Sequence, residues 1–198
     1  MRGHWRTGVV AGLSALLLTI AGCTGGGDTE PTPEPEPTET TPTGPPPQPE
    51  GADGVTWEIE NWDEYAEDEA VLAYKEWSEA ISASVNTGEL LPRARELASR
   101  EVLDVYLDQL RFAEDNDLRS QERTLVRIAR SESGADGSTV VACVWSKSAE
   151  LVTADGDYFS DEEPRWARQV AQVETEAGAP VLNQVDFDGN CRGEEPPA

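Results

Sequence analysis

The chain has 198 residues, with 39 acidic against 15 basic side chains and a formal net charge of −24. A charge of this sign repels phosphate backbones, so nucleic acid is not expected as a partner. The single histidine, His4, lies at the extreme N-terminus. Its position excludes histidine-based catalytic triads and histidine-ligated metals from the rest of the chain.

Residues 1–23 have the features of an export signal. Two arginines precede a mostly apolar run of 12 residues, Val9 to Ile20, which as a helix spans only about 18 Å and is too short to cross a membrane. The run leads into the sequence LTIAGC at residues 18–23, which resembles the lipobox of bacterial lipoproteins. The alternative is an ordinary signal peptide with an incidental cysteine.

The lipobox resemblance implies a signal peptide over residues 1–22 and attachment of diacylglycerol and palmitate to Cys23. Two or more acyl chains are enough for stable anchoring in a bilayer. We therefore expect an exported lipoprotein whose partner is the membrane itself, at the outer face of the cytoplasmic membrane.

Residues 23–54 are expected to form the lipidated cysteine and a disordered linker rich in Pro, Glu and Thr. Between Thr24 and Glu50 there is no Ala, Val, Ile, Leu, Met or aromatic residue, and nine prolines fall between Pro31 and Pro49. Such a segment cannot bury enough apolar surface to offset the entropy of ordering. Because proline favours extended polyproline II, the linker could hold a domain up to about 80 Å from the membrane.

Residues 55–191 are predicted to form one α+β domain, followed by an acidic tail at 192–198. Its first half has helical periodicity: apolar residues recur from Val71 to Val85, with Asp68 as a candidate N-cap and Gly88 as a stop. Pro92 suits the first turn of a helix. A further helix carries Leu103, Tyr106, Leu107 and Leu110 on one face and should end near residues 115–117.

The second half of the domain changes to strand periodicity. Strands are predicted at residues 124–131, 139–148, 165–174 and 181–187, separated by turn sequences at 134–137, 155–157 and 178–180. Helices followed by strands joined through short turns favour two or three N-terminal helices packed on one face of a curved, four-stranded antiparallel sheet.

This order of elements, with the sequence ACV at residues 142–144 and a last strand that ends just before Cys191, is similar to actinobacterial lipoproteins and secreted proteins of the nuclear-transport-factor-two-like class. The resemblance covers roughly residues 57–191. It implies a cone-like domain with a cavity between the helices and the sheet, where enzymes of the class place carboxylates, Tyr, His or Arg.

Cys143 and Cys191 are the two cysteines that remain once Cys23 carries a lipid. Export places them in an oxidising compartment, and an even pair has one intramolecular connectivity, so we predict a disulfide. Two thiols without a histidine leave a zinc site incomplete. Free buried thiols are the alternative.

Seven residues are candidates for lining a pocket in the cone. Arg127, Arg168 and Asp186 lie on predicted strands and could meet across the sheet, although an ordinary surface ion pair explains them as well. Trp77, Tyr106, Trp145 and Trp166 could line the cavity, or could be plain core residues.

No other motif assigns a catalytic residue, a metal or a cofactor. The acidic residues at 155–163 are suited to calcium by ligand type but lack the spacing of an EF-hand loop. The leading hypothesis is therefore a non-catalytic binding or scaffolding module for a small apolar ligand or another envelope protein. The alternatives are a small hydrolase or isomerase that uses a buried carboxylate, and a purely structural assembly factor of the envelope.

Overall fold

The computed structural model describes residues 44–147, 150–160, 163–193 and 197. All of these belong to the compact unit that spans residues 43–198. The expected signal peptide, Cys23 and the linker up to residue 43 lie outside the described residues, as does most of the tail from 194 onward.

Within the described residues, four helices precede the long strands. They are α1 (Trp62–Tyr65), α2 (Glu69–Thr87), α3 (Pro92–Leu97) and α4 (Arg100–Asp115). The sequence predicts two or three, because the one-turn helix α1 is too short to show a periodic pattern. The ends of the helices follow from local sequence. The Asp68 carboxylate accepts hydrogen bonds from the first free N–H groups of α2, and Gly88 ends that helix with a φ of 69°. The predicted caps, the proline at the start of α3 and the end of α4 at residue 115 are confirmed.

The domain is α+β as predicted, but its main sheet is mixed and has five strands in the order β1-β3-β4-β6-β7. These strands are β1 (Thr56–Ile59), β3 (Arg123–Gly134), β4 (Gly137–Ser146), β6 (Arg165–Glu176) and β7 (Ala179–Asn190). The prediction of four antiparallel strands is wrong because β1 joins the edge parallel to β3. A separate ribbon pairs β2 (Leu118–Ser120) with β5 (Leu151–Thr153).

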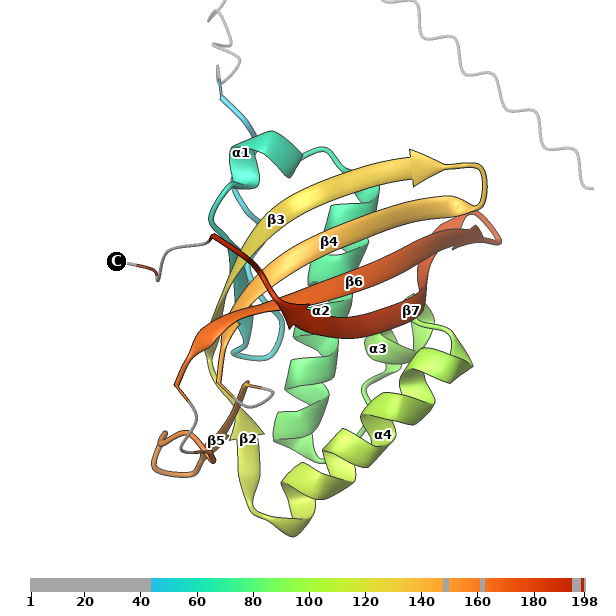
Figure 1. Cartoon of the computed structure of the whole chain (residues 1–198). Coiled ribbons are helices and arrows are strands. Elements are labelled where there is room, and N and C mark those ends of the chain that lie inside the picture. The colour runs from blue at the N-terminus through green and yellow to red at the C-terminus, as the bar shows by residue number, and fades with distance from the viewer. Residues whose placement is uncertain (1–43, 148–149, 161–162, 194–196, 198) are drawn as a thin grey trace, which may run out of the picture. The chain divides into compact units, whose positions relative to one another are not determined.

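The long strands curl over α2, which fills the concave side of the sheet (Figure 1). Alternate residues of β4, namely Val140, Ala142 and Val144, face this side and join the core with α2. Their neighbours Val141, Cys143 and Trp145 point to the opposite side of the sheet, which we call the outer face. Each residue of a long strand therefore belongs either to the core side or to the outer face.

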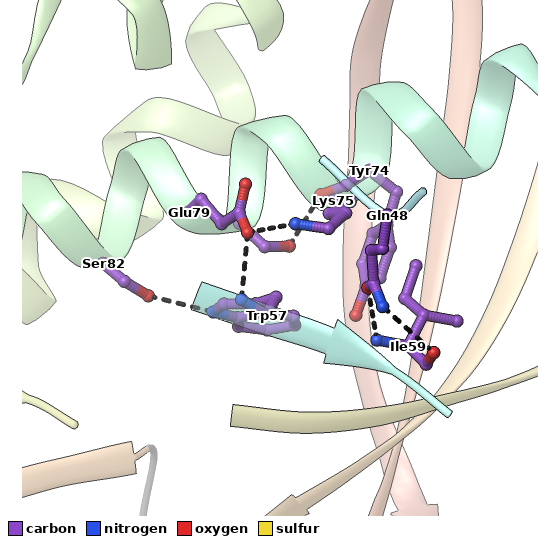
Figure 2. Close-up of polar contacts among 8 residues, drawn as sticks. Gln48, Trp57, Ile59, Tyr74, Lys75, Glu79 and Ser82 are labelled. Atoms are coloured by element: carbon purple, nitrogen blue, oxygen red, sulfur yellow. Dashed lines mark hydrogen bonds and ion pairs between the residues drawn. The ribbon is translucent and has the colours of Figure 1, made fainter. Parts of the chain in front are cut away.

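Groups outside the sheet hydrogen-bond both of its edge strands. Along β1, the backbone N–H of Trp57 donates to Glu79 Oε1 at 3.0 Å, and that of Ile59 donates to Gln48 Oε1 at 2.6 Å (Figure 2). At the other edge, the N–H of Ser99 donates to the carbonyl of Leu182 in β7 at 2.8 Å. The indole N–H of Trp62 also donates to the carbonyl of Pro46 at 2.8 Å. The segment before β1 therefore contacts the domain from Pro46 onward, ahead of residue 55, where the sequence places the start of the domain.

Candidate functional site

A cavity of about 30 Å³ lies between α2, α4 and the concave side of the sheet. This volume is room for one or two water molecules. Helices, strands and the residue before β5 all contribute to its wall. The lining residues are Trp57, Trp77, Ile81, Ser82, Val85, Tyr106, Gln109, Ser120, Glu150, Gln169 and Phe187.

Glu150 is the unexpected member of this lining. Glu150 is only 7% exposed. Its φ of 64° lies in the left-handed region, which residues other than glycine rarely adopt. The backbone is held on both sides, because its N–H donates to the carbonyl of Lys147 and its carbonyl accepts from the N–H of Gln121. A buried carboxyl is thus fixed at the cavity wall in an uncommon conformation.

Burial raises the pKa of the Glu150 carboxyl to about 8, because the charged form loses its hydration. Within the described part of the chain, no hydrogen bond reaches this carboxyl. The nearby hydroxyls of Tyr74 and Tyr106 have raised pKa values, first through their own burial and second through the charge of Glu150. At neutral pH the cavity is therefore lined by a mostly protonated carboxyl and the neutral phenol of Tyr106.

Trp77, which also lines the cavity, has an unpaired polar group. It is 1% exposed, and its indole N–H has no hydrogen-bond partner among the described residues. Its ring meets that of Tyr106 edge to face, with centroids 4.8 Å apart. Because a buried N–H without a partner costs free energy, the Trp77 indole is a local cost within the packing of α2.

Two other polar side chains near the cavity are paired. The hydroxyl of Tyr74 donates to Gln169 Oε1 at 2.8 Å, and the indole N–H of Trp57 donates to Ser82 Oγ at 3.4 Å. Phe187 also lines the cavity, yet its side chain is 58% exposed. This residue therefore marks the mouth through which the cavity meets solvent.

The structure brings two of the seven predicted pocket residues, Trp77 and Tyr106, to this cavity. The other five lie on the outer face, because strand register and the alternation of side chains place them opposite α2. Trp145 and Trp166 meet edge to face there, with centroids 5.4 Å apart. These five residues are Trp145, Trp166, Arg127, Arg168 and Asp186.

On the outer face, Arg127 and Asp186 each have a partner elsewhere. Arg127 pairs with Glu60 and lies over the ring of Trp166, 5.3 Å from its centroid. Asp186 is exposed and accepts a hydrogen bond from the Gln184 amide. The buried carboxyl at the cavity is therefore Glu150 and not Asp186, and the sequence did not single out Glu150.

The predicted disulfide between Cys143 and Cys191 is confirmed. The two Cα atoms lie 5.9 Å apart, and 48 positions separate the residues in the chain. Cys143 lies in the middle of β4, and Cys191 follows β7, so the bond fastens the end of the last strand to the centre of the sheet.

A second polar cluster lies where α2 meets β1 (Figure 2). The ammonium of Lys75 forms an ion pair with the carboxylate of Glu79, and the two side chains are only 2% and 5% exposed. Burial raises the pKa of Glu79, whereas the hydrogen bonds from Lys75 and from the backbone of Trp57 lower it. We interpret this cluster as structural, because both charges and the edge of β1 are satisfied internally.

Within the described ranges, no group of three His, Cys, Asp or Glu side chains is arranged to hold a metal ion. Residues 161 and 162 of the acidic loop lie outside those ranges. In the same part of the chain, no helix combines the length and apolar character needed to cross a membrane.

Comparison with known proteins gives no match: no family model, no curated protein and no solved structure matches this chain. The likeness to bacterial lipoproteins and to the nuclear-transport-factor-two-like class therefore stays a prediction from the sequence.

Proposed function

We propose that this protein is a lipid-anchored, extracytoplasmic binding protein whose cone-like domain takes up a small ligand at the Glu150 cavity without catalysing a reaction. One observation carries the proposal: the buried Glu150 carboxyl lines the cavity, and burial alone, with no hydrogen bond from the described residues to offset it, sets its raised pKa. Buried polar groups are normally paired, so a buried carboxyl of this kind at a cavity points to a ligand that pairs it.

The small volume limits what enters. A cavity of about 30 Å³ admits a head group of a few atoms rather than a whole apolar molecule. The remainder of a larger ligand would leave past Phe187, whose exposed ring offers apolar contact at the mouth. This geometry favours a ligand with a polar head over the wholly apolar ligand that the sequence suggests.

Filling the cavity should abolish binding. Ser120 is buried and lines the cavity, so Ser120→Val adds volume where the ligand would lie. Native mass spectrometry of the full chain purified from its own envelope should show a small-molecule adduct in the wild type and none in this variant. Ser133→Val, at an exposed position of β3, should retain the adduct. An adduct of equal abundance in all three proteins, or none in the wild type, would contradict the cavity as the binding site.

A small acid-base enzyme is the second candidate, favoured by the pKa of Glu150 near 8. A carboxyl that titrates close to neutral pH suits proton transfer. If the protein is an enzyme, the chain purified for native mass spectrometry should convert the compound that it binds and release the product. A binding protein should retain the compound unchanged.

The membrane anchor has its own test. Metabolic labelling with a fatty-acid probe should mark the wild-type chain and leave Cys23→Ala unlabelled, since the lipobox ends at this cysteine. Equal labelling of both chains would mean that Cys23 is not the site of acylation.

A further inference from the structure

We propose that an exposed ridge of α4 binds a basic amphipathic helix of a partner protein. The ridge consists of five side chains spaced alternately four and three residues apart along the helix, namely Glu101, Val105, Asp108, Phe112 and Asp115. All five are exposed, and α4 lies at the periphery of the domain (Figure 1). This contact is separate from the small ligand proposed at the Glu150 cavity.

The spacing of the ridge places its side chains in one line. Residues three or four positions apart are neighbours on the surface of a helix. A line that repeats every 3.5 residues on average stays in contact with a second helix packed alongside, as in a coiled coil. From residue 101 to residue 115 the line covers about 21 Å of helix. A partner helix of about four turns could therefore follow the ridge from end to end.

Two members of the ridge are apolar although they face solvent. Val105 is 65% exposed and Phe112 is 43% exposed, while other apolar residues of α4 pack into the core. The ring of Phe159, itself 47% exposed, meets that of Phe112 edge to face, with centroids 5.4 Å apart. Contact with an apolar partner would remove this surface from water, which favours association.

The other three members of the ridge determine the charge of the partner. Glu101, Asp108 and Asp115 alternate with the apolar residues along the line. Asp108 pairs with Arg111 at 2.9 Å, but the Asp108 side chain is 81% exposed, and a carboxylate can accept from more than one donor. Lys or Arg side chains at matching positions of a partner helix would therefore meet these carboxylates while apolar residues between them cover the patch.

The same charge disfavours two other occupants of the ridge. A two-fold contact between copies of this chain would set the acidic line against itself, and each copy has a formal net charge of −24. An anionic membrane surface would be repelled for the same reason. A cationic helix is therefore favoured over a second copy and over a membrane.

The chemistry of the ridge is tested with three synthetic peptides of about six helical turns. The first has Leu and Lys alternating along one side at the spacing of the ridge, with Ala and Gln elsewhere. The second has Glu in place of Lys, and the third has the composition of the first in scrambled order. Titration calorimetry uses the full-length chain in phosphatidylcholine nanodiscs, with empty nanodiscs as the blank. We expect the first peptide to bind about tenfold more tightly than either of the others.

Point variants place the contact on the ridge. Val105→Ser and Phe112→Ser should each weaken binding of the first peptide about tenfold, because each removes apolar surface from the contact. Asp108→Asn should weaken it about threefold. Asp104→Asn is the matched control: it also removes a carboxylate that pairs with an arginine of α4, but off the ridge, and should have no effect. Val105→Ser, at the more exposed position, decides the outcome if Phe112→Ser fails to fold.

Photo-cross-linking in cells that express the chain natively tests for the partner itself. The cross-linking residue p-benzoylphenylalanine in place of Val105 should capture a protein segment in which Lys or Arg alternates with apolar residues at helical spacing. The same residue in place of Asp104 should not capture that segment.

Several results would overturn the inference. They are equal binding of the three peptides, binding unaffected by Val105→Ser, and, from position 105, no cross-link or one to lipid, to a second copy of this chain or to a segment of another kind. The proposed binding function would then still be decided by the adduct seen in native mass spectrometry and its loss in Ser120→Val.

Discussion

Raising the pH through the window from about 4.5 to about 8 is expected to reduce the free energy of unfolding by about 5 kcal/mol through Glu150 alone. Burial moves the pKa of this carboxyl from the ordinary 4.5 to about 8. Below this window both the folded and the unfolded chain hold the proton, so Glu150 has no effect on stability. Within the window the unfolded chain ionises while the folded chain stays protonated, and stability is progressively lost.

Denaturant unfolding at pH 5, 7 and 9 measures this effect. Because the other carboxyl groups also titrate, the informative quantity is the difference between the wild type and Glu150→Gln, which keeps the shape of the side chain but cannot ionise. The variant should lose less stability between pH 5 and pH 9, by about 4 kcal/mol. Glu122→Gln, at an exposed loop position, should follow the wild type. Identical pH dependence in the wild type and Glu150→Gln would show that the carboxyl is hydrated in solution.

Lys75→Met should destabilise the domain by about 3–5 kcal/mol, because it leaves the Glu79 carboxylate buried without its ion-pair partner. The two side chains are 2% and 5% exposed, so solvent does not screen the loss. The backbone N–H of Trp57 would remain as a donor to Glu79. The measurement is the shift of the denaturant midpoint at pH 7.

Two further variants test whether the loss comes from the unpaired Glu79 charge and from the burial of the pair. Lys75→Met combined with Glu79→Gln removes both charges and keeps an acceptor for the Trp57 N–H. This double variant should recover about 2 kcal/mol or more of the loss. Arg93→Met breaks the pair with Glu76, in which both side chains are about half exposed, and should cost at most about 1 kcal/mol. If Lys75→Met costs no more than Arg93→Met, the buried pair does not stabilise the fold.

Local signals in the sequence were enough to predict the main helices and the long strands. Asp68 caps α2, Gly88 ends it, and the turn sequence at residues 134–137 joins β3 to β4, because each of these acts within a few residues of its own position. The strand β1 was missed, since four residues are too short for a periodic pattern. Its partner β3 lies more than 60 positions away in the chain, so no local signal reports the parallel pairing.

The candidate site was harder to predict than the fold. Trp77 and Tyr106 were found because helical periodicity places them on buried faces of α2 and α4. Asp186 and the two arginines were considered instead of Glu150, because the pattern of a strand does not say which of its faces meets the helices. Glu150 itself stands beside the short strand β5, and a glutamate there is ordinarily exposed. Only the packing of α2, α4 and the sheet around it makes it a buried acid.

The side chains and loops that bond to the outermost strands also bear on aggregation. An unpaired strand edge is a template on which a second copy of a chain can add its own strand. In this domain the outward N–H groups of Trp57 and Ile59 are occupied by Glu79 and Gln48, and the Leu182 carbonyl is occupied by Ser99. An incoming strand would have to displace these partners before it could pair. The domain can therefore keep a strongly apolar β4 at its centre and resist edge-to-edge association even when many copies are crowded together.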